Sequence, residues 1–551
     1  MPVVNIGKDR LKKFIPNVKV DKVLEMLPFV GLDIEGIDGN NIRVEYNPNR
    51  PDFSSDYGIV RALRGLLEIE TGMPRFRVAK GKSQYTVEVE EQQVKNIRPY
   101  IVALAAKNGR LDDESIRQLI SMQEDLHNGI GRRRKKASIG IHALDTIHFP
   151  ITYKTISRDY SFVPLGESST KSIEQILKES EMGKQYGHIL SGSDMHHYPI
   201  IVDSAGTTLS FPPIINGNVT KVDTKCRNVF VEVTATDQRT AQDMLAIIAV
   251  TLYDIGFEIW PVRIGEKKVE TPQMQPTKII VSPDYINTIL GLNLSVKQTV
   301  ACLRKSRLDA KQTNGNKITC IIPRYRTDII HPIDITEEIA IGYGIYNFEP
   351  VFPVAAISGQ KNLLSTYFDA VRETLIGLGM LESLNFSLTS REVEYDFFGI
   401  TPENVLSVDS SKSIEHEILR ESVIPSLLES LSHNVHEEYP QRLFEIGKTF
   451  HERIEIQERW SAGAVIAYAE ASYTQIKSAL QALLKTAFGK ECTTKVSKNP
   501  FFLQGRCAEI LVDDKMIGTI GEITPYALEN FKLRVPVAAF EINLSILTGI
   551  Q

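Results

Sequence analysis

The stretch PRYRTDIIHPIDITEEIAIGYGIY, residues 323–346, places four carboxylates within eleven residues. These are Asp328, Asp334, Glu337 and Glu338. Asp328 comes after an apolar run typical of a strand, whereas the isoleucines that follow Asp334 recur at helical spacing. On such a helix Asp334, Glu337 and Glu338 share one face. Pro332 fixes the turn that folds Asp328 back towards them, so the stretch predicts a strand, a turn and an acidic helix.

Two interpretations of this acidic cluster fit its spacing. In the first, Asp334 is the N-cap of the helix and Glu337 completes a capping box. Glu338 then offsets the helix dipole, and Asp328 has no role. In the second, the four carboxylates converge on a hard dication that removes their mutual repulsion, and all-oxygen ligation favours Mg²⁺ over zinc. The spacing alone leaves both interpretations open.

Composition limits the class of protein. A length of 551 residues predicts three or four domains at about 150 residues each. With 42% hydrophobic residues, 24% charged residues and a net charge of −5, the chain is ordinary globular protein, and any contact with RNA must use local basic patches. Five scattered cysteines without a C-x-x-C pair indicate a reducing compartment and no zinc site. Neither a membrane span nor a signal peptide is evident, so a cytoplasmic protein is expected.

Residues 1–80 predict a small α/β domain. A strand at 3–6 and a helix at 57–70 enclose the sequence NPNRPD (47–52), whose prolines cannot continue a strand. Arg50 in this loop is compatible with a phosphate site. We favour a structural loop in which Arg50 pairs with Asp52.

Residues 81–265 predict a mixed α/β domain with many short strands and a helix at 113–128. The run GRRRKK (131–136) is either a solvated basic face or a contact for RNA phosphates. The run VFVEVTATD (229–237) alternates, so Glu232 and Thr234 lie on one face of a strand. That face is either the wall of a pocket or a solvated surface, and Asp237 is expected to cap the helix that follows.

Residues 270–346 predict two short helices, a hairpin that turns at Asn314 and Gly315, and then the acidic stretch. Ser282 and Ser295 are the expected N-caps of these helices. The order helix, helix, hairpin indicates a winged-helix-like domain. Few cations accompany it, so we do not expect a DNA reader.

RTDIIHPIDITEEIAIGYGI resembles the signature R-x-D-I-x-x-x-x-D-[LI]-x-E-E-[IV]-A-x-x-Y-G-[YI] of the phenylalanyl-tRNA synthetase β-subunit family, in its archaeal and eukaryotic-cytosolic form. The runs NPNRPDF and QEDLHNGIGRRRKKASIGIH are similar to the family's N-terminal and editing domains. The resemblance extends over essentially the whole chain. It implies Mg²⁺ as cofactor, with Asp328, Asp334, Glu337 and Glu338 as its ligands.

The family's editing domain hydrolyses tyrosine wrongly esterified to the phenylalanine tRNA. A pocket lined with polar groups accepts the tyrosyl hydroxyl and rejects phenylalanine, which leaves those groups unpaired. By resemblance the pocket residues are expected to be Ser210, Asn216, Glu232 and Thr234, with water as the nucleophile. The sequences SFPPIIN and EVTATD carry this expectation.

Residues 355–551 resemble the antiparallel catalytic-type fold of class II synthetases, with a helix at 362–378 and strands at 382–387, 442–447 and 538–543. A working class II site needs an arginine on the ATP α-phosphate two residues before a glutamate, and a glycine-rich strand that ends in a second arginine. Here Arg442 lies three residues before Glu445, on the opposite face, and the closing strand has neither glycine nor arginine. The domain is therefore expected to be catalytically degenerate.

These features together predict an α+β multidomain chain with a small N-terminal α/β domain (1–80), an editing domain (81–265), a winged-helix-like domain with the metal stretch (270–346) and a class II-like domain (355–551). The chain is expected to act in an α₂β₂ tetramer whose α subunit binds ATP and charges tRNA(Phe), with no membrane partner. Two alternatives stay open: a stand-alone hydrolase that edits tRNA in trans, and a non-catalytic scaffold.

Overall fold

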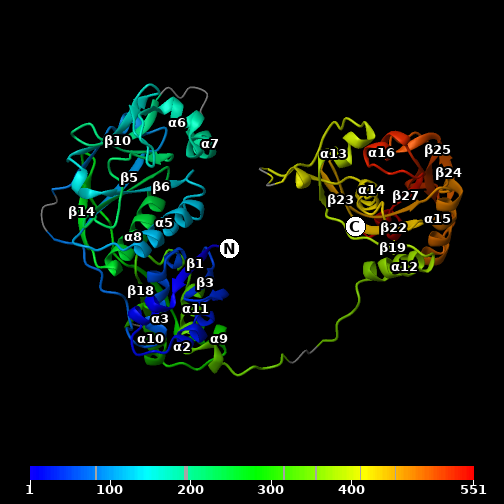
Figure 1. Ribbon diagram of the computed structural model, residues 1–551. Helices are drawn as coiled ribbons and strands as arrows, with labels where there is room; N and C mark the ends of the chain where they lie inside the picture. The colour runs from blue at the N-terminus through cyan, green and yellow to red at the C-terminus, as the bar shows by residue number, and fades with distance from the viewer. Residues whose placement is uncertain are drawn as a thin grey trace. The chain divides into compact units, whose positions relative to one another are not determined.

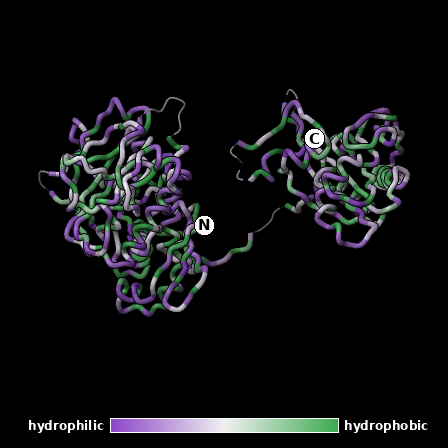
Figure 2. The backbone as a smooth tube through the Cα atoms, turned by 45° about the horizontal axis from the view of Figure 1, so that its top comes forward, coloured by the Kyte–Doolittle hydropathy of each residue, from purple (hydrophilic) through white to green (hydrophobic). Residues whose placement is uncertain are grey.

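The computed structural model describes residues 1–80, 84–190, 197–313, 317–353, 357–409, 411, 413–452 and 455–550. The chain forms two compact units, Met1–Val351 and Phe352–Gln551, each described here by itself (Figure 1). Hydrophobic segments run through both units (Figure 2). No helix in the described part of the chain is long and apolar enough to cross a membrane.

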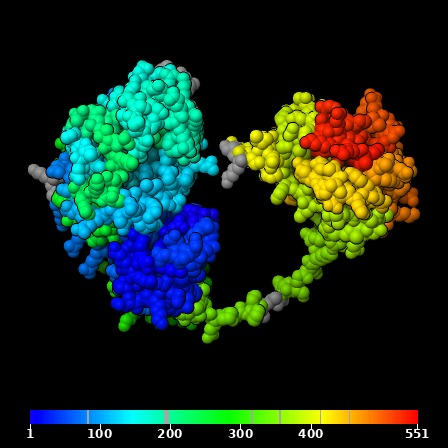
Figure 3. Space-filling view, viewed as in Figure 1, coloured from blue at the N-terminus to red at the C-terminus, as the bar shows by residue number. Residues whose placement is uncertain are grey.

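The first unit begins with a three-stranded antiparallel sheet of order β1-β3-β2. The elements of this domain are β1 (Val3–Gly7), α1 (Lys8–Phe14), α2 (Val20–Met26), β2 (Leu32–Asp38), β3 (Asn41–Tyr46) and α3 (Asp56–Leu66). The predicted strand and loop are confirmed, and the predicted helix ends earlier, at Leu66. Ser55 caps this helix by accepting a hydrogen bond from the Gly58 N–H. The surface of this domain, dark blue in Figure 3, is continuous with that of the following one.

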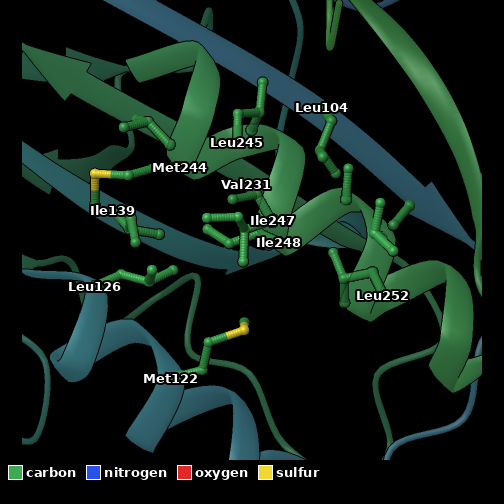
Figure 4. Close-up of a cluster of buried hydrophobic side chains, with 14 of the residues drawn as sticks. Leu104, Met122, Leu126, Ile139, Val231, Met244, Leu245, Ile247, Ile248 and Leu252 are labelled. Carbon is green, nitrogen blue, oxygen red and sulfur yellow. The ribbon is translucent and has the colours of Figure 1, made fainter. Parts of the chain in front are cut away.

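A large mixed sheet follows, with the order β12-β11-β10-β7-β4-β14-β5-β13-β6. Its strands are β4 (Thr86–Val89), β5 (Tyr100–Lys107), β6 (Ala137–Ala143), β7 (Ile151–Ser157), β10 (His197–Val202), β11 (Thr208–Phe211), β12 (Ile215–Asn216), β13 (Val229–Ala235) and β14 (Glu258–Ile264), with β15 (Val269–Thr271) on β14. Its helices are α4 (Glu91–Val94), α5 (Asp113–Asn128), α6 (Ile173–Glu179), α7 (Glu181–Tyr186) and α8 (Gln238–Ile255), and β8 (Ser161–Phe162) pairs with β9 (Lys171–Ser172). Figure 4 shows side chains of α5 and α8 meeting those of β5, β6 and β13 in its largest core.

Strand β13 pairs with β5 and β6 along its two edges, and both of its faces are buried. Val231 on one face packs in the core formed with α8, and Phe230 on the other face packs in a second core. The solvated-face interpretation of Glu232 and Thr234 is therefore wrong, since both side chains are buried. Asp237 caps α8 by accepting a hydrogen bond from the Thr240 N–H, as predicted.

The remainder of the first unit holds the sheet β16-β18-β17 and three helices. The elements are β16 (Thr277–Val281), α9 (Pro283–Leu290), α10 (Val296–Lys305), β17 (Asp309–Thr313), β18 (Lys317–Ile322) and α11 (Pro332–Tyr343). Ser282 and Ser295 cap their helices as predicted, whereas the turn at Asn314 and Gly315 lies outside the described residues. The N-cap of α11 is His331, so the prediction that Asp334 is this N-cap is wrong.

The second unit is built on a seven-stranded sheet of order β19-β22-β23-β27-β26-β25-β24. Its strands are β19 (Leu381–Glu382), β22 (Gln441–Glu452), β23 (Ile456–Ala467), β24 (Thr493–Val496), β25 (Phe502–Val512), β26 (Lys515–Ile523) and β27 (Val537–Asn543), and β20 (Leu388–Thr389) pairs with β21 (Ile418–Leu419). Its helices are α12 (Leu363–Gly377), α13 (Arg391–Glu394), α14 (Ile424–His433), α15 (Tyr473–Phe488), α16 (Pro525–Asn530) and α17 (Leu544–Thr548). The continuous strand predicted for 382–387 is wrong, because β19 ends at Glu382 and the next strand, β20, begins only at Leu388.

The two faces of this sheet bury different cores. Even-numbered positions such as Phe444 and Phe540 pack against α12 and α15. Odd-numbered positions such as Val465 and Ala539 pack against α14. Because side chains alternate along a strand, Glu445 lies on the α14 face. Glu445 is the residue that the sequence analysis compared with the glutamate of a class II site.

Candidate functional site

A cavity of about 410 Å³ lies beside strand β6 in the first unit. Isoleucine, leucine and proline side chains from α5, β6 and the segment 212–222 form most of its wall, together with Leu165 and with Met182 of α7. A few polar groups are set into this wall: Gln123, Glu124, His127, Arg134, Ser138, Ser210, Asn216, Thr220 and Lys221. An apolar hollow with a few placed polar groups is the usual form of a small-ligand site.

Two of the four predicted pocket residues line this cavity. Ser210 of β11 and Asn216 of β12 are cross-strand partners, so both belong to one hairpin. The hairpin turns through Pro212 and Pro213. The structure thus places Ser210 and Asn216 side by side at a cavity wall.

Arg134 was missed because it lies within the run GRRRKK, where nothing distinguishes one cation from the next. Arg132, Arg133 and Arg134 all have positive φ, between 49° and 64°. This left-handed turn leaves Arg132 and Arg133 exposed and buries Arg134. Arg134 Nη1 donates to the carbonyl of Ile214 at 3.0 Å, and Arg134 thus ties the basic turn to the segment after β11.

Arg134 also binds the carboxylate of Glu124 on α5, which in turn contacts the imidazole of His127. Its Nη2 donates to Glu124 Oε1 at 2.7 Å, and His127 Nδ1 lies 3.2 Å from the same oxygen. His127 Nε2 accepts a hydrogen bond from the Ile139 N–H, so the proton is on Nδ1. Burial lowers the pKa of His127. Burial alone would raise the pKa of Glu124, but the hydrogen bond from His127 and the Arg134 charge hold it below its usual range.

Thr234 does not line the cavity. Its hydroxyl bonds to Ser138 at 3.1 Å, and Ser138 does line the wall. Its carbonyl accepts a hydrogen bond from Arg98, which also donates to the carbonyl of Arg134. Burial lowers the pKa of Arg98 to about 10. Thr234 and Arg98 thus support the cavity from behind, which spacing alone does not reveal.

Glu232 is also buried behind the cavity, and only 1% of its surface is exposed. Its Oε1 lies 3.9 Å from His142 Nε2. Glu232 Oε2 and His142 Nε2 are both buried and have no hydrogen-bond partner among the described residues. His142 Nδ1 bonds to Thr220 Oγ1 at 2.8 Å, and Thr220 lines the cavity. A Cβ on Gly140 would lie 2.3 Å from the Glu232 carboxylate and 2.6 Å from His142 Nε2, so any other residue here would displace these side chains.

The acidic stretch at 328–338 forms an ion-pair network. Arg326 donates to both Asp328 and Glu338, and all three side chains are at least 88% buried. Although burial alone would raise the pKa of Asp328, Arg326 holds it below its usual value. Asp334 accepts hydrogen bonds from the N–H groups of Ile330 and His331, both at 2.7 Å. Asp328 therefore has a structural role as a partner of Arg326. The helix-cap interpretation gave it none.

A second arginine joins this network from the N-terminal domain. Arg50 donates two hydrogen bonds to Asp52 at 2.9 Å, which confirms the predicted loop closure. Its guanidinium also lies 3.9 Å from Asp328 and 3.8 Å from Glu338. We call the group Arg50, Asp52, Arg326, Asp328 and Glu338 the arginine clamp. It joins two domains through Arg50 and Asp328, which are 278 residues apart in the sequence.

The four predicted metal ligands all belong to this stretch. Burial raises the pKa of Glu337, and the negative charges of Glu338, Asp334 and Asp328 raise it further. In the described part of the chain, however, no three carboxylate, histidine or cysteine side chains are grouped so as to hold a metal ion. The donor chemistry fits Mg²⁺, but the present side-chain arrangement does not.

The α14 face of the C-terminal sheet is filled by its own chain. Arg420 and Glu445 form a fully buried ion pair at 2.6 Å. A Cβ on Gly447 would lie 2.1 Å from Arg420, and one on Gly463 would lie 2.4 Å from Val423. Segment 420–428 therefore lies directly on the face that carries Glu445.

Two family models match the chain in its second half. The model described as the tRNA synthetase B5 domain matches residues 279–345. The model described as the phenylalanyl tRNA synthetase beta chain CLM domain matches residues 349–544. The chain is therefore a mixed α/β multidomain component of an aminoacyl-tRNA synthetase.

Comparison with whole chains specifies the family. The phenylalanine–tRNA ligase beta subunit of Archaeoglobus fulgidus is 39% identical over 99% of this chain and 98% of its own. That of Methanococcus aeolicus is 36% identical over 99% and 100%. A crystal structure of an N-terminal fragment of the Pyrococcus horikoshii phenylalanyl-tRNA synthetase beta subunit matches with a TM-score of 0.59 at 32% identity, over 62% of this chain and 100% of that chain. The chain belongs to the phenylalanine–tRNA ligase beta subunit family.

Proposed function

We propose that this chain is the scaffolding and proofreading subunit of a cytoplasmic α₂β₂ phenylalanyl-tRNA synthetase. A separate α subunit binds ATP and charges tRNA(Phe) with phenylalanine. The chain described here supports that subunit and hydrolyses tyrosine wrongly esterified to the same tRNA. Its relatives' names and the cavity beside β6 support this assignment.

The filled α14 face supports the absence of a synthetic site. Class II chemistry needs an accessible sheet face with a free guanidinium for the ATP phosphates. On this face Arg420 is neutralised by Glu445, and Val423 occupies the space above Gly463. Arg442 is on the opposite side, where Nη1 lies 3.4 Å from the Leu378 carbonyl. On this face Arg420 is therefore not a free cation for ATP, and Val423 takes up space above Gly463.

Adenylate formation tests this division of labour. The purified chain should show no phenylalanine-dependent exchange of pyrophosphate into ATP, and addition of the α chain should restore it. Exchange by the isolated chain would overturn the proposal.

The cavity beside β6 supports the editing role. Its apolar wall accommodates an aromatic ring, and its few polar groups are matched by a tyrosyl hydroxyl but not by phenylalanine. Ser210 and Asn216 lie at the wall, and Glu232 is connected to it through His142 and Thr220.

Deacylation of tyrosyl-tRNA(Phe) by the assembled enzyme tests the pocket. Asn216→Ala should slow hydrolysis about tenfold or more because it removes a polar group from the wall of an apolar site. Glu232→Gln should slow it similarly because it removes the carboxylate charge behind that wall. Charging with phenylalanine should be unchanged and serves as the control. Unchanged deacylation in both variants would favour a non-catalytic scaffold, and full deacylation by the chain alone would favour a stand-alone hydrolase.

We further propose that the acidic stretch binds Mg²⁺ through Asp328, Asp334, Glu337 and Glu338. Binding requires Asp328 and Glu338 to exchange Arg326 for the ion. Calorimetric titration of chelator-treated protein with MgCl₂ should show binding that Glu337→Gln abolishes and that Glu349→Gln, an exposed control, does not. Absence of binding at millimolar Mg²⁺ would leave the stretch as an ion-pair network.

A further inference from the structure

The free edge of strand β6 forms part of the cavity wall. Pairing of β6 with β13 is regular from Ala137 to Ala143. In a regular antiparallel pair the main-chain groups of alternate residues point to the partner, and those of the others point away. The Ile139 N–H points away, because it donates to His127 Nε2 at 2.8 Å. The Ala143 N–H also points away, because it donates to the Thr220 carbonyl at 2.8 Å. Ile141 lies midway between these two residues, so its main-chain N–H and carbonyl point to the same side as theirs.

Ile141 differs from its neighbours along this edge. At Ile139 both groups are covered, since Gln123 Nε2 donates to the carbonyl at 2.8 Å. At Ile141 neither the N–H nor the carbonyl has a hydrogen-bond partner beyond β6 in the described ranges. Gln123, His127, Ile141 and Thr220 all line the cavity. One donor and one acceptor of the main chain therefore adjoin the cavity side by side.

Such a pair constrains what the cavity can hold. Buried main-chain groups are almost always hydrogen-bonded, because an unpaired one loses its bond to water without replacement. A ligand that displaces water from the cavity must itself supply an acceptor for the N–H and a donor for the carbonyl. Edge strands bind extended peptides by the same two-point contact. The end of an aminoacyl ester that all amino acids share has this arrangement, a carbonyl oxygen next to an α-ammonium group.

We propose that the main chain of Ile141 anchors the aminoacyl ester of the mischarged tRNA in the cavity. Its carbonyl accepts a hydrogen bond from the α-ammonium group, and its N–H donates to the ester carbonyl oxygen. The N–H also stabilises the charge that develops there when water adds to the acyl carbon. The ribose oxygen then leaves and takes the proton, which yields free tyrosine and tRNA. This inference rests on the proposed editing function and assigns the constant part of the substrate to β6, whereas Ser210 and Asn216 meet its variable part.

The first test removes the donor from the main chain. Ile141→Pro deletes the N–H at an edge position, where proline does not interrupt the ladder to β13. In the assembled enzyme, kcat/KM for hydrolysis of tyrosyl-tRNA(Phe) should fall about ten- to hundredfold, as expected for a hydrogen bond to a charged group. Ile141→Val changes the side chain by one methyl group and keeps the N–H, so it should stay within about threefold of the parent. Phenylalanine charging shows whether each variant is folded.

The second test leaves the protein unchanged. tRNA(Phe) esterified with 3-(4-hydroxyphenyl)propionate keeps the phenol and the ester but lacks the α-ammonium group. Its enzymatic rate relative to its spontaneous hydrolysis should be about tenfold or more below the same ratio for tyrosyl-tRNA. Equal ratios, together with equal rates for the proline and valine variants, would overturn the anchor while hydrolysis of tyrosyl-tRNA still upheld the editing function. If the proline variant does not charge tRNA, the ratio for the deaminated ester decides alone. Failure of the parent enzyme to hydrolyse tyrosyl-tRNA would instead overturn the editing proposal itself.

Discussion

Glu394, at the end of α13, has a buried carboxyl group. It is 1% exposed, and it accepts hydrogen bonds from the N–H groups of Glu421 and Ser422 at 2.8 and 2.9 Å. Burial raises its pKa to about 8, although these two donors lower it, and the negative charges of Glu541 and Glu421 add to the rise. The folded unit therefore prefers the protonated acid.

This preference predicts a pH dependence of stability. Because the folded pKa of Glu394 is above its unfolded value near 4.5, its contribution is complete below that value and is lost as pH rises towards 8. The loss has a limiting slope of about 1.4 kcal/mol per pH unit. Glu394→Gln cannot ionise, so its unfolding free energy should vary less between pH 5 and 8. Urea unfolding of the C-terminal unit at several pH values measures the slope.

The matched control is Glu392→Gln, which changes an exposed carboxylate on the same helix. It should keep the slope of the parent. An identical slope in the Glu394 variant would show that Glu394 is not the group responsible.

At the scale of elements, the arginine clamp joins the loop before α3 to α11. Arg50 is 14% exposed, its partner Asp52 is 3% exposed, and its guanidinium lies 3.8 Å from the centre of the Phe53 ring. Removal of one partner from a buried pair leaves an uncompensated charge. Arg50→Ala should therefore destabilise the first unit by about 2–4 kcal/mol. The urea midpoint of that unit measures the change.

An exposed ion pair of the same domain provides the contrast. Arg43 contacts Glu35 at 2.6 Å, but both side chains are at least 40% exposed. Arg43→Ala should cost less than about 1 kcal/mol. Equal effects of the two substitutions would show that the clamp adds no more than a surface pair.

At the scale of the whole molecule, the first unit has its own cores and should fold without the second. A fragment of residues 1–351 should unfold cooperatively at a midpoint close to that of its counterpart in the full chain. The solved N-terminal fragment of the Pyrococcus horikoshii relative, which covers 62% of this chain, supports the same boundary. Calorimetry of the fragment and the full chain compares the midpoints.

A shorter fragment is the control. Residues 1–265 lack Tyr325, which is 4% exposed in the largest core, and Arg326, which completes the clamp. This fragment should be markedly less stable than 1–351. Equal stability would mean that the domain at 277–346 contributes nothing to the first unit.

Local features could be predicted from the sequence because their causes lie within a few residues. Ser282, Ser295 and Asp237 cap helices because each side chain accepts a hydrogen bond from the N–H group three residues later in the chain. The loop closure by Arg50 and Asp52 spans two residues. Family membership also follows from the sequence, since the acidic stretch carries a recognisable pattern.

Only the tertiary structure decided what depends on contacts between distant segments. The inward position of Arg134, the burial of both faces of β13 and the pairing of Arg50 with Asp328 are set by neighbours that no local pattern specifies. The N-cap of α11 is His331 instead of Asp334, because the Asp334 carboxylate accepts hydrogen bonds from the N–H groups of the preceding turn. The sequence by itself determined the helix caps at Ser282, Ser295 and Asp237, the loop closure by Arg50 and Asp52, and the family. The cavity, the clamp and the filled sheet face arise only when the chain packs, because burial assigns each polar group its partner.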